Sequence, residues 1–155
     1  MAKFLNQALI TIGTLAVLGL CFFFWFSIQS SHFESQARAF ANGYVFKLSE
    51  SWEFSEVEAE SSPDFMSMVS TDNGRETVKI FRRFGKLIEI SDFQALHTTI
   101  SFGETSGIYQ FKASFVNTKA VGLIEIIEIE GQLRVRGLRF NVTEPLPTKI
   151  SEFKA

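Results

Sequence analysis

The residue types that most often carry catalysis are scarce in this chain of 155 residues. A proton-transfer site needs a carboxylate base and a hydrogen-bond donor that meet in one apolar cavity. The candidates are three aspartates and two tyrosines: Asp64, Asp72, Asp92, Tyr44 and Tyr109. The aspartates lie in helix-start, turn and loop patterns, where a carboxylate serves the helix dipole or the turn. The tyrosines fall on apolar faces. The sequence therefore predicts no catalytic Asp–Tyr pair and no enzyme.

The remaining patterns predict neither a metal nor a cofactor. The two histidines, His32 and His97, are far apart in the chain, whereas a metal site usually has three or four clustered ligands. Residues 103–107, Gly-Glu-Thr-Ser-Gly, have threonine at their centre and no strand-to-helix context. They predict a hairpin loop rather than a nucleophile elbow.

Composition argues against nucleic-acid binding and against an intramolecular disulfide. Fifteen Lys and Arg residues stand against seventeen Asp and Glu residues, so the chain lacks the basic surface that is typical of nucleic-acid binding. A single cysteine, Cys21, excludes an intramolecular disulfide. Eighteen phenylalanines predict a core packed with aromatic rings, with an aromatic-walled cavity as the alternative.

The N-terminal residues predict a membrane anchor. Residues 8–28 carry no charge and are long enough to span a bilayer as one helix. Residues 22–26, Phe-Phe-Phe-Trp-Phe, are typical of a membrane interface. We expect residues 1–30 to form an uncleaved single-pass anchor, because the apolar run is too long for a signal peptide. Lys3 before the run and the late Arg38 after it favour a cytoplasmic N-terminus and a soluble domain outside the cytoplasm.

Helical periodicity begins directly after the anchor. Apolar residues recur every three or four positions from Phe33 to Leu48, which predicts one long helix over residues 31–49. Residues 52–57 predict a short helix or a turn.

Two further helices are expected before the chain changes character. Ser62 as cap and Pro63 at the first helical position predict the second helix, with a buried face made of Phe65, Met68 and Val69. Asn73 predicts the start of the third, and Gly85 its end. The buried face of the third helix is expected at Val78, Phe81 and Phe84.

Beyond Gly85 the hydrophobic period changes to two, which indicates strands. Strands are predicted at 86–90, 96–102, 109–115, 120–129 and 133–142, the last with a bulge near Gly137. Turns are predicted at residues 103–107, 117–118 and 130–131, and Asp92 is expected to start a loop. The order predicts an α+β fold, with helices packed on a curved antiparallel sheet of four or five strands. Residues 144–155, with two prolines, predict an extended tail.

Charged residues on the last strand could form a docking face. Arg134, Arg136 and Arg139 are expected near three glutamates of the preceding strand, Glu125, Glu128 and Glu130. One hypothesis is that these residues form ion pairs across the hairpin. The other is that they form a polar docking face for a partner. A second basic group, made of Arg82, Arg83 and Lys86, could touch anionic lipid headgroups.

Residues 31–143 resemble the nuclear transport factor 2-like superfamily. The resemblance rests on the following residues: Leu48, Trp52, Pro63, Asp64, Phe65, Phe84, Gly85, Lys86, Leu87, Tyr109, Phe111, Ala113, Phe115, Ala120, Gly131, Leu133, Val135, Leu138, Phe140 and Asn141. In particular the chain is similar to small membrane-anchored bacterial proteins of this superfamily. The resemblance implies a curved sheet wrapped round a long helix, with an apolar cavity between them. It also implies a bacterial inner-membrane location, with the domain in the periplasm.

Members of that superfamily include ketosteroid isomerase, ligand binders and periplasmic assembly modules, so the fold alone does not choose a function. We expect a non-enzymatic interaction or assembly module that holds a membrane-protein partner or a second copy of the chain. The alternative is a binder of a small apolar ligand, with cavity walls that include Tyr44, Phe81, Tyr109, Phe111 and Phe140. An isomerase-like enzyme is the third hypothesis. A cystatin-like or ferredoxin-like α+β domain is the alternative fold.

Overall fold

A computed structural model of the chain describes residues 17–20, 33–101 and 104–144. The chain divides into two units, Met1–Gln36 and Ala37–Ala155. In the first unit, the described residues 17–20 and 33–36 are helical. The predicted membrane helix over residues 8–28 lies outside the described residues, except for 17–20. No helix in the described part of the chain is long and apolar enough to cross a membrane.

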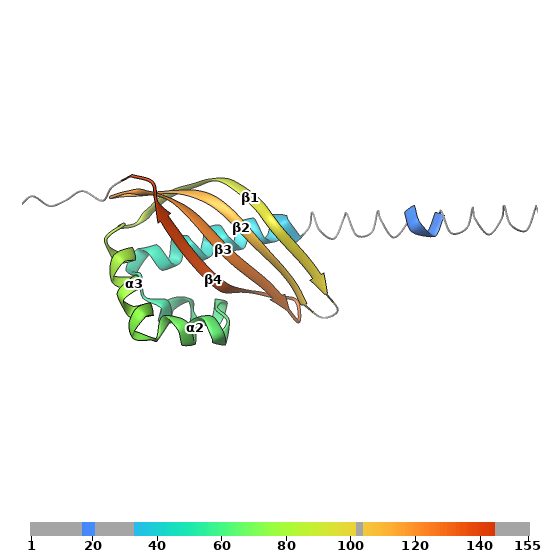
Figure 1. Cartoon of the computed structure of the whole chain (residues 1–155), viewed down its shortest axis with the longest axis horizontal. Helices are drawn as coiled ribbons and strands as arrows, with labels where there is room; N and C mark the ends of the chain where they lie inside the picture. Colours follow the sequence, from blue (N-terminus) through green and yellow to red (C-terminus); the bar gives the residue numbers. More distant parts are fainter. Residues whose placement is uncertain (1–16, 21–32, 102–103, 145–155) are drawn as a thin grey trace, which may run out of the picture. The chain divides into compact units, whose positions relative to one another are not determined.

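The domain has the predicted α+β class. Its sheet has four antiparallel strands in the order β1-β2-β3-β4, which are β1 Leu87–Ser101, β2 Glu104–Phe115, β3 Lys119–Ile129 and β4 Gln132–Val142. Figure 1 shows the strands curving across one long helix, with the shorter helices gathered beyond β4. We call the side of the sheet away from the long helix its outer face.

The long helix runs over residues 33–51 in the described chain, where 31–49 is predicted. Its buried face includes Ala41, Tyr44, Val45 and Leu48. The helix gives way at Trp52, whose φ of 57° is left-handed. A short 3-10 helix, η1 Phe54–Glu60, follows and covers most of the predicted short helix or turn.

The next two helices are α2 Pro63–Val69 and α3 Asp72–Arg82. Ser62 caps α2 as predicted, because its Oγ accepts a hydrogen bond from the backbone N–H of Phe65 at 3.3 Å. The prediction that Met68 is buried is wrong, since Met68 is 58% exposed and α2 buries only Phe65. Asn73 is not the cap of α3: Thr71 holds that position, with its Oγ1 3.1 Å from the backbone nitrogen of Gly74.

Strand β1 corrects two predictions. It is one strand and not two, with register shifts between Leu87 and Glu89, Ser91 and Gln94, and Ala95 and His97. Asp92 starts no loop: its φ of 51° places it inside the strand at a bulge.

The predicted turn over residues 103–107 is shorter than expected. Glu104 pairs with Ser101 and Gly107 pairs with Thr98, so residues 104–107 belong to β2 and not to a turn. Of these residues Glu104 is exposed, Thr105 and Ser106 are half-buried and Gly107 is buried, so polar residues are tolerated on a strand with one solvated face.

The last two strands follow the prediction closely. Glu130, with φ of 53°, and Gly131, with φ of 76°, turn the chain between β3 and β4, and a two-residue hairpin turn of this type needs positive φ at both positions. The predicted bulge near Gly137 is confirmed. Glu125 pairs with Gly137 and Ile126 pairs with Val135, which leaves Arg136 as the extra residue.

Candidate functional site

Aromatic rings pack against one another between the long helix and the sheet. Trp52, which is 3% exposed, contacts four phenylalanine rings at centroid distances of 5.7 to 6.2 Å: Phe81, Phe84, Phe115 and Phe140. Its indole Nε1 donates to the carbonyl oxygen of Gly85 at 3.1 Å. Trp52 thus joins the aromatic cluster at its helical side, a position that its place between two helices does not predict.

Four of the five predicted cavity residues, Phe81, Tyr109, Phe111 and Phe140, are connected through ring contacts in this cluster. Phe140 lies edge-on to Phe81 at 5.2 Å and to Phe111 at 6.1 Å. Phe111 stacks on Phe93 at 6.2 Å, and Phe93 stacks on Tyr109 at 4.9 Å. The predicted residues therefore belong to one connected set of rings on the inner side of the sheet, and their neighbours are other rings.

Tyr44, the fifth predicted cavity residue, lies apart from that cluster. Its hydroxyl is 2.8 Å from Ser61 Oγ, and Ser61 Oγ donates to the carbonyl of Val57 at 2.8 Å. Burial raises the pKa of the Tyr44 phenol above its ordinary value, and the hydrogen bond to Ser61 opposes this only in part. Tyr44 therefore links the long helix to η1 as a neutral phenol.

The three aspartates lie away from both buried tyrosines. Asp64 and Asp92 are exposed, the side chain of Asp72 is 97% exposed, and Asp92 forms an ion pair with Lys112 at 2.6 Å. Asp92 and its partner hold neighbouring strands together on the outer face. The geometry in the described residues brings no aspartate to either tyrosine.

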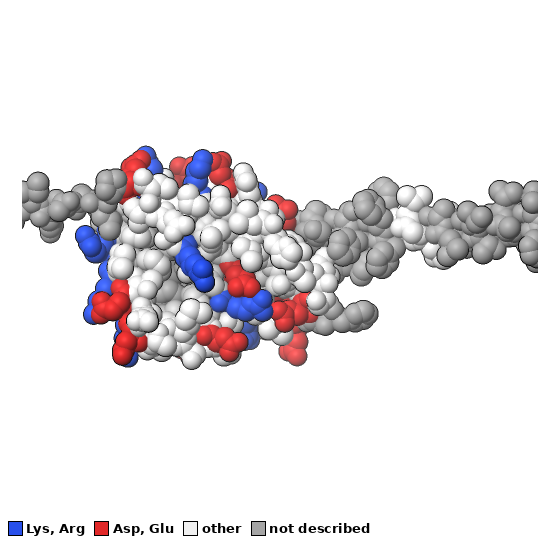
Figure 2. Space-filling view, viewed as in Figure 1, with Lys and Arg blue, Asp and Glu red and all other residues white. Residues whose placement is uncertain are grey.

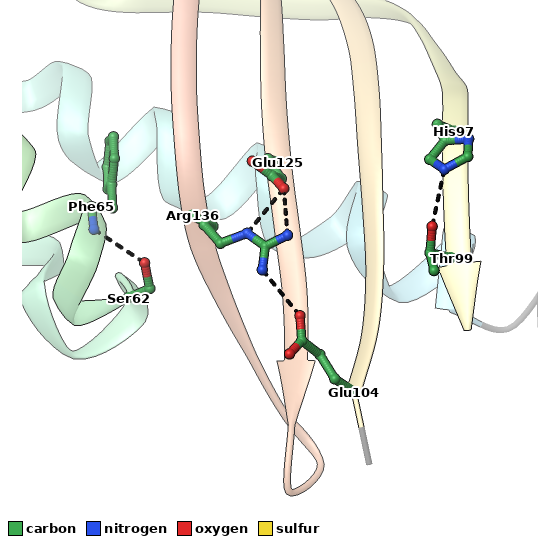
Figure 3. Close-up of polar contacts among 7 residues, drawn as sticks. All are labelled: Ser62, Phe65, His97, Thr99, Glu104, Glu125 and Arg136. Atoms are coloured by element: carbon green, nitrogen blue, oxygen red, sulfur yellow. Dashed lines mark hydrogen bonds and ion pairs between the residues drawn. The ribbon is translucent and has the colours of Figure 1, made fainter. Parts of the chain in front are cut away.

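The outer face of the sheet carries an organised group of charged residues. The guanidinium of Arg136 donates twice to Glu125 Oε1, at 2.9 and 2.7 Å, and once to Glu104 Oε1, at 3.1 Å (Figure 3). The hydrogen bonds that Arg136 donates to Glu125, together with the charges of both glutamates, raise the pKa of Arg136. The side chain of Arg136 is 38% exposed, so this group of three residues faces solvent. Glu104 was missed because it was assigned to a turn.

The other two predicted arginines share this face with different surroundings. Arg134 Nη2 is 3.4 Å from Gln132 Oε1. Arg139 pairs in register with Leu123 and is exposed, and it forms no ion pair within the described residues. Neither Glu128 nor Glu130 pairs with these arginines in the described chain.

A hollow of about 310 Å³ opens where α2 borders the outer face. Apolar and cationic side chains line it together, among them Met68, Ile108, Leu123, Arg136, Leu138 and Arg139. Figure 2 shows uncharged surface on either side of the few charged side chains on this face. Apolar walls beside an unpaired guanidinium suit a partner with an apolar side chain and a carboxylate.

A second hollow of about 850 Å³ lies between η1, α2 and α3. Arg82 lines it and forms an ion pair with Glu53. Lys86 pairs with Glu50. Two members of the predicted basic group are therefore neutralised by neighbouring carboxylates, which weakens its attraction for anionic headgroups.

The described residues contain no cluster of three or more metal-ligating side chains. His97 lies exposed on β1 and its Nε2 is 3.0 Å from Thr99 Oγ1 (Figure 3). The other histidine, His32, lies outside the described residues. No known family model matches the chain, and searches of curated proteins and of solved structures also find no match.

Proposed function

We propose that this chain is a single-pass inner-membrane protein whose periplasmic, nuclear transport factor 2-like domain is a non-enzymatic interaction and assembly module. The outer face of the sheet is its docking surface, and the anchor is the apolar run over residues 8–28. The partner is a membrane protein that presents an apolar side chain and a carboxylate to this face.

One observation carries the proposal: exposed apolar side chains surround organised charges on the outer face. Ile108 is 37% exposed and Met68 is 58% exposed, beside the unpaired Arg139. Surfaces that combine an apolar centre with a few fixed charges are typical of protein interfaces. Arg136 is already held by two glutamates, so little side-chain freedom would be lost there on docking.

The interior supports the same choice. A ligand bound between helix and sheet would have to part rings that touch at 5 to 6 Å, such as Phe81 and Phe140 at 5.2 Å. Close-packed cores resist such openings. A small molecule found by native mass spectrometry in the purified protein would favour the apolar-ligand hypothesis instead.

Site-specific photo-crosslinking in native membranes tests the docking surface. A photoreactive phenylalanine analogue is placed at Leu123, on the outer face, and in a control chain at Glu76, an exposed position on α3. We expect one adduct of defined mass from Leu123, its loss on Arg139→Glu, and none from Glu76. Equal labelling from both positions, or none from Leu123, would contradict the proposal.

Membrane orientation is tested separately. In a Cys21→Ser chain, Ser70→Cys places one thiol at an exposed position of the domain. A thiol reagent that cannot cross membranes should label this residue in cells whose outer membrane is permeable and whose inner membrane is intact. Labelling only after the inner membrane is opened would place the domain in the cytoplasm.

A further inference from the structure

Strand β1 has one edge that β2 does not cover. Side chains of the long helix cap this edge at two points: Ser49 Oγ accepts from the backbone N–H of Leu87 at 3.0 Å, and Arg38 donates to the carbonyl of Phe93 at 2.9 Å. From residue 94 to residue 101, the described chain offers the backbone no partner besides β2. Such an edge is a template for another strand.

The open part of the edge lacks the charged residues and the proline that usually protect an edge strand. Residues 94–101, Gln-Ala-Leu-His-Thr-Thr-Ile-Ser, contain no Lys, Arg, Asp, Glu, Pro or Gly. Natural edge strands are normally kept apart by charges, proline, bulges or short length. One register shift lies within this run, between Ala95 and His97, and the pairing from His97 to Ser101 with β2 is regular. This stretch can therefore accept a further strand without rearrangement.

Exposed apolar side chains occur near both ends of β1: Leu96 lies in the open stretch, whereas Phe46 and Ile88 lie beside the first residues of the strand. Phe46 is 54% exposed, Ile88 66% and Leu96 55%. A hollow of about 310 Å³ lies between the long helix and the first residues of β1, with Phe46, Gly43 and Ile88 among its lining. Leu96 is thus the large exposed apolar side chain within the open stretch, next to backbone groups that another strand could pair with.

The opposite edge of the sheet decides which partner fits. On β4, the backbone N–H of Ser62 donates to the carbonyl of Val135 at 2.8 Å, and Ser61 forms a β-bridge to the same residue. This edge is thus occupied at its centre, so β1 of one molecule cannot pair along β4 of the next. Pairing of β1 with β1 is self-complementary and closes as a two-fold dimer.

We propose that two copies of the chain pair antiparallel through residues 97–101 of β1 and so join their sheets. The run is uncharged, hence the two copies meet without like-charge repulsion. The dimer uses the sheet edge and not the outer face. Its test is therefore independent of the test of the docking surface proposed above.

The oligomeric state of the full chain tests this dimer. Leu96→Lys adds a charge at the edge at an exposed site, and Val116→Lys adds the same charge at a site that is 62% exposed and outside the edge. By light scattering of the detergent-purified protein, we expect dimers of the wild type and of Val116→Lys. We expect Leu96→Lys to weaken the dimer by about tenfold or more. A monomeric wild type, or an unchanged Leu96→Lys dimer, would overturn the proposal.

Disulfide trapping gives a readout that does not depend on the lysine variant. Single cysteines replace His97, Thr98, Thr99, Ile100 and Ser101 in turn in a Cys21→Ser chain, and Asp72→Cys on α3 is the control. Oxidation of membranes should give a disulfide dimer that is strongest at one or two positions, near the two-fold axis. A uniform yield across the five positions, or a yield equal to the control, would contradict β1 pairing. The crosslinks from Leu123 should persist in Leu96→Lys.

Discussion

Gly122 on β3 is the position where one added methyl group should cost most. It faces Phe111 across the β2–β3 pair, on the inner side of the sheet. A Cβ atom at Gly122 would lie 2.3 Å from Cζ and 2.4 Å from Cε2 of the Phe111 ring. Real Cβ atoms do not approach carbon atoms that closely. The Phe111 ring therefore packs directly on the backbone of Gly122, in the space that a side chain at this position would occupy.

The surroundings of Phe111 set the magnitude. Phe111 is fully buried, and Phe93 and Phe140 lie against its ring at 6.2 and 6.1 Å. The ring can move only by pushing these neighbours, and overpacking of a close-packed core costs about 1–3 kcal/mol. Because the overlap involves several ring atoms, we expect Gly122→Ala to lower the free energy of unfolding by about 3 kcal/mol.

Urea unfolding followed by Trp52 fluorescence measures this loss. A Trp25→Phe background leaves Trp52, which is buried among the rings, as the single tryptophan. With an m-value of about 2 kcal/mol per molar urea, the midpoint should fall by about 1.5 M. Gly43→Ala is the matched control, since a Cβ there meets no atom within 4 Å. Because Gly43 lies in the long helix, Gly43→Ala should raise the free energy of unfolding by about 0.5–1 kcal/mol.

Two results would refute the reasoning on Gly122. One is a midpoint for Gly122→Ala within error of the wild type, which would mean that the ring has room to move. The other concerns Phe111→Leu, which removes the atoms that clash. The double variant should be more stable than the sum of the two single changes predicts, and strict additivity would show that the cost lies elsewhere.

Three further outcomes follow from local geometry. Ser62→Ala removes the cap of α2 and should cost about 1 kcal/mol in urea unfolding, whereas exposed Ser70→Ala should cost less than about 0.5 kcal/mol. Burial raises the pKa of Tyr44 in the folded state, so stability is complete below the unfolded tyrosine pKa and falls as pH rises above about 10. Tyr44→Phe should flatten that fall between about pH 9 and pH 11. Glu130→Asn, before Gly131 in the hairpin turn, should raise stability by about 0.5–1 kcal/mol in thermal melts.

Local rules were enough for the helices and for the class of the fold. The spacing of apolar residues placed the end of the long helix at residue 49, two residues from its end at 51, an ordinary margin for helix ends. Ser62 and Pro63 located the start of α2 through capping alone. These predictions succeed because the forces involved, capping hydrogen bonds and a buried stripe, act between residues near in sequence.

Strand β1 shows what local rules miss. Its alternation breaks at three register shifts, so the pattern looked like two strands and a loop around Asp92. Pairing with β2 holds the backbone in one strand through that break, and a bulge there turns Phe93 inward and Asp92 outward. Only the partner strand provides this information, because an isolated bulge has no sequence period. Glu104, a third member of the Arg136 group, was missed for the same reason.

The bulge on β4 explains why the candidate docking surface exists. In a strand with strict alternation, Arg134 and Arg136 share a face, but Arg139 points to the other side. The extra residue at Arg136 reverses the alternation. Leu138 therefore turns into the core, where it is 7% exposed, and Arg139 turns out beside Leu123.

The bulge thus does two things at once. It removes a cation from the aromatic interior, where a charge without a partner would be costly. It also gathers three cations on the face that carries Ile108 and Leu123. The three arginines stay on one face only while β3 and β4 keep this register. The proposed docking surface therefore depends on the β3–β4 pairing more than on any single arginine.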